Sequence, residues 1–217
     1  MQRTDITPTQ SPALAALINN DYELNFQEFM DQIQLANKPM SLASIRFILD
    51  NIELSKEEIK SLASFDKETY CRQRLFKNDH CEVLILSWLN GQRSKIHDHL
   101  NTSCGVKVLH GQATETLFET AANGHIFASQ STHFQEGSVT VSKDNDIHQI
   151  SNLQAGDEPL ITLHVYSPPL SQFHLYQLES GKSELLDIEQ ECWAYEIEHL
   201  SVATCLQIPT KFWGSFG

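Results

Sequence analysis

The stretch HDHLNTSCGVKVLHG, residues 97–111, carries the pattern on which the fold assignment depends. Residues two apart on a β-strand face the same side, so a strand here would point His97 and His99 one way and Asp98 the other. Cys104 follows, and the run CGVKVLHG alternates apolar residues before it ends at Gly111, which is typical of a strand and its turn. The stretch therefore predicts β-structure that presents two imidazoles on one face.

Period-two alternation extends over most of the chain on either side, beginning at about residue 69. Glycine, asparagine, aspartate or proline often punctuates the runs, and many short strands with regular turns are typical of an antiparallel sandwich or small barrel. We therefore expect a mainly β fold. The strand-like runs are CEVLILSWL (81–89), CGVKVLHG (104–111), TETLF (114–118), SVTVS (138–142), HQIS (148–151), PLITLHVYS (159–167) and FHLYQLE (173–179).

Residues 12–65, in contrast, read as several short helices. Ser11 with Pro12, and then Ser41, are expected helix starts, and Ser55 with Glu58 has the spacing of a capping box. Residues 185–217 fit either a helix or a strand. We expect a single domain over 1–217, with a mainly helical segment at 1–68, a β-barrel core at 69–183 and an extension at 184–217 packed on the barrel.

Composition excludes several classes of protein. The net charge is −13, which disfavours nucleic acid and anionic membranes as partners because both need basic patches. No apolar run reaches the roughly 18 residues of a membrane-spanning helix, and the first residues lack the apolar core of a secretory signal. The five scattered cysteines lack CxxC pairs, which favours a reducing cytosol. We expect a cytoplasmic monomer.

A second histidine motif lies downstream of the first. An HxH pair alone is more often surface or core histidine than a metal site. Here, however, Gly91, His97, His99, Cys104 and Gly111 have the spacing of the first cupin motif, with cysteine where glutamate is usual. Gly137, His148 and Asn152 have the spacing of the second motif, although KDN (143–145) replaces its usual turn. The chain thus resembles a cupin, a jelly-roll-like β-barrel with an internal metal site.

The expected metal site consists of His97, His99 and His148. Three imidazole ligands that leave further coordination positions of the metal open suit zinc, iron, nickel or copper. Because they are neutral, they leave the full charge of a divalent metal uncompensated, which favours an anionic ligand such as a substrate thiolate. This reasoning does not separate iron from zinc.

Further stretches resemble the cysteine dioxygenase family. They fall in the family's order over roughly residues 70–183, and the resemblance implies a ferrous ion, Fe(2+), on the three histidines and oxidation of L-cysteine by O₂ to cysteine sulfinic acid. The matching stretches are YCRQRL (70–75), VLILSW (83–88), IHDHLNTSCGVKVLHGQATETLF (96–118), IHQISN (147–152) and LHVYSPP (163–169).

The same resemblance assigns roles to five further residues. Arg72 matches the arginine that holds the substrate carboxylate, and Tyr70 matches a tyrosine near that group. Tyr166 matches the active-site tyrosine, His164 its hydrogen-bond partner, and Cys104 a cysteine that in many members forms a thioether to that tyrosine. We expect Cys104 not to be a metal ligand.

Physical reasons support some of these roles independently. A guanidinium offers a planar donor fork for a carboxylate, although Arg72 alone would be read as a surface residue. A strand through TLHVY places Thr162, His164 and Tyr166 on one face. These side chains could form a hydrogen-bond chain, or they could form a polar ladder that has no catalytic role.

Two alternative functions remain open. One is a dioxygenase of another small thiol such as 3-mercaptopropionate; enzymes for that substrate resemble this chain but carry glutamine at the Arg72 position. The other is a cupin that binds a metal or small ligand without catalysis.

Overall fold

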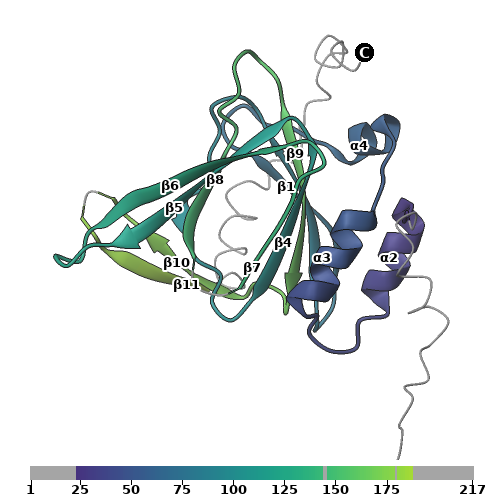
Figure 1. Cartoon of the computed structure of the whole chain (residues 1–217), viewed down its shortest axis with the longest axis horizontal. Helices are drawn as coiled ribbons and strands as arrows, with labels where there is room; N and C mark the ends of the chain where they lie inside the picture. The colour runs from purple at the N-terminus through teal and green to yellow at the C-terminus, as the bar shows by residue number, and fades with distance from the viewer. Residues whose placement is uncertain (1–22, 144–145, 179, 188–217) are drawn as a thin grey trace, which may run out of the picture.

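The computed structural model describes residues 23–143, 146–178 and 180–187. Two β-sheets face each other across an interior, and short helices cover the outside of one of them (Figure 1). The expected mainly β architecture with N-terminal helices is therefore confirmed, and it is that of a cupin barrel.

The first sheet has five strands in the order β1-β2-β9-β4-β7, and all its pairs are antiparallel. Its strands are β1 (Cys71–Lys77), β2 (Glu82–Trp88), β4 (Ser103–His110), β7 (Val139–Lys143) and β9 (Leu160–Ser167). The second sheet has six strands in the order β11-β10-β3-β8-β5-β6, also antiparallel. Its strands are β3 (Ile96–His97), β5 (Gln112–Thr120), β6 (Ile126–Gln135), β8 (Ile147–Ser151), β10 (Gln172–Tyr176) and β11 (Ser183–Asp187).

The strands β2 and β9 are buried along their whole length. One face of each packs against the helices, where Val83, Ile85 and Leu163 join the larger apolar core. The other face looks into the barrel, where Leu84 and Tyr166 join a second core. Burial on both faces explains why these two strands read as nearly continuous apolar runs in the sequence.

Among the described residues, three helices precede the barrel: α2 (Phe26–Gln34), α3 (Leu42–Asn51) and α4 (Lys56–Leu62). The expected cap at Ser41 is confirmed, since its side chain accepts a hydrogen bond from Ser44 N. The expected capping box of Ser55 and Glu58 is confirmed as well, and Asn25 with Glu28 forms another at α2 that the sequence analysis did not predict. In the described part of the chain, no helix is long and apolar enough to cross a membrane.

Helix α3 lies directly on strand β4, and a glycine on the strand permits this close approach (Figure 1). A Cβ atom at Gly105 would lie 2.3 Å from Ile45 Cγ2 and 2.7 Å from Leu49 Cδ1. A larger residue at this position would clash with these two side chains of α3 and force them to shift.

The sequence analysis missed strands β1, β6 and β11, whereas β3 is the two-residue start of the strand expected around His97 and His99. Most of β6 is exposed, so it shows little apolar alternation. Strand β1 begins with the polar run CRQR, and its residues are exposed or only partly buried, so it carries no continuous apolar signal. The expected helix start at Ser11 and Pro12 lies outside the described residues, as does most of the segment 185–217.

Candidate metal centre

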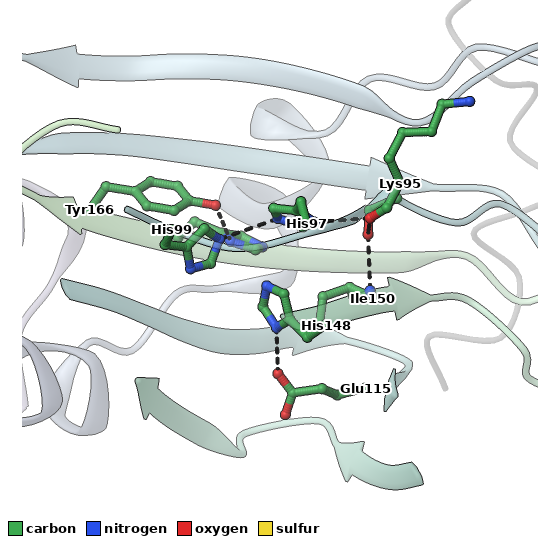
Figure 2. Close-up of polar contacts among 9 residues, drawn as sticks. Lys95, His97, His99, Glu115, His148, Ile150 and Tyr166 are labelled. Carbon is green, nitrogen blue, oxygen red and sulfur yellow. Dashed lines mark hydrogen bonds and ion pairs between the residues drawn. The ribbon is translucent and has the colours of Figure 1, made fainter. Parts of the chain in front are cut away.

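Three histidines from two neighbouring strands and one turn converge inside the barrel (Figure 2). His97 ends β3 and pairs in register with His148 on β8. The possible ligand atoms of His97, His99 and His148 all lie within 4.8 Å of one another. The strand expected to carry both His97 and His99 ends at His97, but the turn that follows still brings His99 into the cluster.

The hydrogen bonds of two rings fix which nitrogen is free. His97 Nδ1 donates to the Lys95 carbonyl at 2.9 Å, and His148 Nδ1 donates to Glu115 Oε1 at 2.8 Å (Figure 2). A neutral imidazole carries one proton, so the Nε2 atom of each ring keeps its lone pair. His148 Nε2 is buried and, among the described residues, has no hydrogen-bond partner. His97 Nε2 and His99 Nε2 lie 3.2 Å apart.

The surroundings favour the neutral forms of His97 and His99. Burial, together with the neighbouring His148 and Arg72, lowers the pKa of His97 to about 3 against the opposing effect of the hydrogen bond to the Lys95 carbonyl. Burial, with the same crowding of imidazoles, also holds the pKa of His99 well below its usual value. Neutral imidazoles with free, convergent lone pairs are what a divalent transition metal requires, so these residues fit such an ion.

Asp98, between the two histidines, points away from the cluster as expected. Its carboxylate accepts hydrogen bonds from His174 N and His174 Nδ1, each at 2.8 Å, and from the Tyr176 hydroxyl at 2.9 Å. These bonds fasten the turn that carries the histidines to strand β10. The sequence analysis did not foresee this role of His174.

Glu115 is a residue that the sequence analysis missed. A carboxylate on the outer nitrogen of a metal-binding histidine orients the ring and raises its basicity. We expect Glu115→Gln to weaken divalent metal binding about 10- to 100-fold, because a neutral amide is a poorer acceptor. A competitive titration with a metal chelator measures this.

Glu119→Gln provides the matched control, because Glu119 lies on the same strand and is exposed. Its metal affinity should equal that of the wild type. Equal affinities for Glu115→Gln and the wild type would show that Glu115 has no part in metal binding.

Arg72 and Tyr70 line the same cavity as the three histidines. The Arg72 guanidinium donates a hydrogen bond to the Tyr70 hydroxyl, and the Tyr70 ring stacks on Trp88 with centroids 4.0 Å apart. Burial lowers the pKa of Arg72, but Tyr166, Tyr70 and Glu82 together raise it more, so the group stays charged. Part of Arg72 remains exposed to solvent, which places a cation at the edge of the cavity.

A hydrogen-bond chain runs along β9 to the cavity. Trp88 Nε1 donates to Thr162 Oγ1 at 3.2 Å, Thr162 Oγ1 lies 2.9 Å from His164 Nε2, and His164 Nδ1 lies 3.3 Å from the Tyr166 hydroxyl. Burial lowers the pKa of His164 to about 3, with Arg72 and the other histidines adding to the effect. If Thr162 donates to Nε2, the Nδ1 proton faces Tyr166, and every group in the chain has a partner.

Cys104 on β4 stands directly opposite Tyr166 on β9. Its thiol hydrogen-bonds with the Tyr166 hydroxyl, and burial raises the pKa of the thiol to about 12 despite the opposing effect of that bond. Burial also holds the pKa of Tyr166 well above its usual value. In the described residues, the group of possible metal ligands contains the three histidines and does not include Cys104.

Two antiparallel sheets around a cluster of three convergent histidines define the class of the protein: a cupin with a candidate metal centre. A sequence model of the family described as cysteine dioxygenase type I matches residues 25–179. The chain therefore belongs to the cysteine dioxygenase family.

Curated relatives agree with this assignment. The cysteine dioxygenase type 1 of Rattus norvegicus is 28% identical over 185 residues, which cover 83% of this chain and 86% of the relative. The Homo sapiens protein of the same name is 28% identical over 150 residues, covering 67% of this chain and 74% of the relative.

Solved structures with a similar chain path include two of low sequence identity. A protein with a double-stranded β-helix domain from Klebsiella pneumoniae subsp. pneumoniae is 19% identical, with a TM-score of 0.45, and covers 57% of this chain and 96% of its own. A cupin family protein from Methanocaldococcus jannaschii is 18% identical, with a TM-score of 0.38, and covers 48% of this chain and 86% of its own.

Proposed function

We propose that the protein is a non-haem iron thiol dioxygenase that oxidises L-cysteine to cysteine sulfinic acid. The observation that carries the proposal is one cavity lined by three imidazoles, a guanidinium and a buried phenol. Cysteine offers a thiol for a metal on the imidazoles and a carboxylate for Arg72. Both atoms of O₂ are added to the sulfur, so the reaction needs no other reductant.

The metal would be held by His97, His99 and His148 through their Nε2 atoms. A ferrous ion would supply, when bound, Lewis acidity toward the substrate thiol and redox chemistry with O₂. The uncompensated charge of such a site favours binding of the thiol as thiolate.

The remaining residues position the substrate. Arg72 binds the carboxylate through charge-assisted hydrogen bonds, and Tyr70, held by its stack on Trp88, orients the guanidinium. The raised pKa of Tyr166 keeps its hydroxyl protonated at neutral pH, so the phenol serves as a hydrogen-bond donor beside the reacting sulfur. His164 holds the direction of that donor through the chain from Thr162.

We expect a thioether between Cys104 Sγ and the Tyr166 ring carbon beside the hydroxyl. Forming this bond breaks one S–H and one C–H bond, and O₂ accepts the two electrons and two protons. The register of β4 and β9, which places the residues opposite each other, supports this expectation. Intact mass spectrometry after turnover should show a fraction lighter by two hydrogens.

Cys104→Ser should lose the lighter fraction. Cys81→Ser should keep it, because the Cys81 thiol is buried elsewhere and hydrogen-bonds to the Ile33 carbonyl. Absence of the lighter fraction in wild-type protein after repeated turnover would contradict the expectation.

The substrate assignment is tested by O₂ consumption of the iron-loaded protein with L-cysteine and, separately, with 3-mercaptopropionate. Both thiols carry a carboxylate, but only cysteine carries an amine. We expect a higher kcat/KM with cysteine. A higher value with 3-mercaptopropionate would transfer the proposal to that substrate, and O₂ consumption with neither thiol would refute it.

A further inference from the structure

A second arginine, Arg74, lies on the same face of strand β1 as Arg72. Arg72 is opposite Leu86 and Arg74 is opposite Leu84 on β2, and both leucines belong to the apolar core inside the barrel. Two cations on this face would attract a dianion or two carboxylates more strongly than the single carboxylate of cysteine. The charge of Arg74 therefore needs an explanation.

Glu82 supplies the opposite charge. It is 4% exposed, begins strand β2 and stands in register with Tyr166 on β9. Arg74 Nε donates to Glu82 Oε1 at 2.8 Å. The Cα partner of Glu82 on β1 is Lys77, so Arg74 reaches the carboxylate diagonally, past the register shift that follows Arg74. The pair thus neutralises Arg74, and Arg72 is the arginine of β1 that lines the cavity.

The Glu82 carboxylate also acts on the site itself. Burial is the largest influence on the pKa of both Arg72 and Tyr166, and the negative charge of Glu82 raises both values. A buried carboxylate without its partner is costly and draws the nearest cation toward it. Without Arg74, the remaining cations on this face of β1 are Lys77, the exposed cross-strand partner of Glu82, and Arg72, which lines the cavity.

We propose that Arg74 is a positioning residue that holds Glu82, so that Arg72 stays free to bind the carboxylate of the substrate. The inference rests on the proposed thiol dioxygenase function and deepens it. It explains an ion pair between a half-exposed arginine and a buried carboxylate that the reaction does not otherwise use. It also makes the pair a determinant of selectivity for thiols that carry one carboxylate. A pair that only ties β1 to β2 would affect stability but not discriminate between substrates.

Three variants separate these roles: Arg74→Gln, Glu82→Gln and the double variant with both changes. In Arg74→Gln, the released carboxylate competes for Arg72 and repels the substrate, so KM for cysteine should rise roughly ten-fold with a smaller change in kcat. In Glu82→Gln, KM should not rise, because the repelling charge is gone. The double variant should return KM to within about three-fold of the wild type.

Two measurements keep a loss of stability separate from a loss of positioning. Cysteamine is a thiol without a carboxylate. As a competitive inhibitor, it should have the same inhibition constant in Arg74→Gln as in the wild type. The melting temperature of each variant reports its stability. If Arg74→Gln folds poorly, Arg74→Lys replaces it in the test, and because this variant retains the charge, its KM should lie near the wild-type value. Arg46→Gln is the matched control, because Arg46 has the same side-chain exposure of 49% and also pairs with a carboxylate.

Equal KM values for cysteine in Arg74→Gln and the wild type would overturn the inference. So would a raised KM in the double variant that equals that of Arg74→Gln, since removal of the carboxylate should relieve the effect. Failure of the wild-type protein to oxidise cysteine would instead refute the proposed function, so the two failures are distinguishable.

Discussion

His148→Ala is expected to abolish stoichiometric iron binding and to lower O₂ consumption with cysteine by at least about a thousand-fold. The ring of His148 is held by Glu115 on one side, and its other nitrogen is buried without a partner among the described residues. Removing the ring leaves only two imidazoles in the cluster, too few for a stable site with a defined geometry. Metal analysis after gel filtration and O₂ electrode measurements together check the result.

His125→Ala is the control for this change, because His125 is exposed and lies far along the chain from the cluster. It should keep full metal content and full activity. Retention of one iron per chain by His148→Ala would contradict the assignment of the three-histidine site, whatever the activity of the variant.

Arg72→Gln is expected to lower kcat/KM for cysteine by roughly 100-fold, mainly through KM, which corresponds to about 3 kcal/mol. Glutamine can donate a hydrogen bond to a carboxylate but supplies neither the charge nor the two parallel donors of a guanidinium. The kcat/KM of Arg72→Lys should fall between the values of the wild type and Arg72→Gln, because an ammonium restores the charge but not the two parallel donors. Steady-state O₂ consumption over a range of cysteine concentrations measures the effect.

The inhibition constant of cysteamine decides whether Arg72 acts on the carboxylate. It should stay unchanged in Arg72→Gln, because cysteamine has no carboxylate to lose. If cysteine and cysteamine were weakened equally, Arg72 would act through the fold of the barrel and not through a bond to the substrate.

The metal site could be predicted from the sequence because its residues follow local rules. His97 and His99 lie at set distances from Gly91 and Gly111, and His148 lies at a set distance from Gly137, and such spacings reflect the short strands and turns of each motif. The secondary structure that carries each histidine ring was less predictable from these spacings. His99 was expected on a strand and lies in a turn, although its ring still joins the cluster.

The partners of the site residues could not be predicted, because they come from distant strands. Nothing near Glu115 in the sequence indicates that β5 pairs with β8 and brings it to His148. Asp98 was expected to face away, but its bonds to His174 and Tyr176 depend on the pairing of β3 with β10.

The same limit applies to the fold. The fully buried strands β2 and β9 were recognised from their apolar runs, and two helix starts from their caps. The exposed strand β6 was missed, because its hydrogen bonds to β5 and not its side chains keep it in the sheet. Local patterns therefore identify buried elements more readily than elements at the edge of a sheet.

Anaerobic loading of the protein with ferrous iron, followed by isotopically labelled O₂ and L-cysteine, tests the central claim most directly. Mass spectrometry of the product should show cysteine sulfinic acid with both oxygen atoms taken from O₂, formed only when iron is present. Iron bound to the protein without sulfinate from cysteine, or a product with label in only one oxygen, would contradict the account.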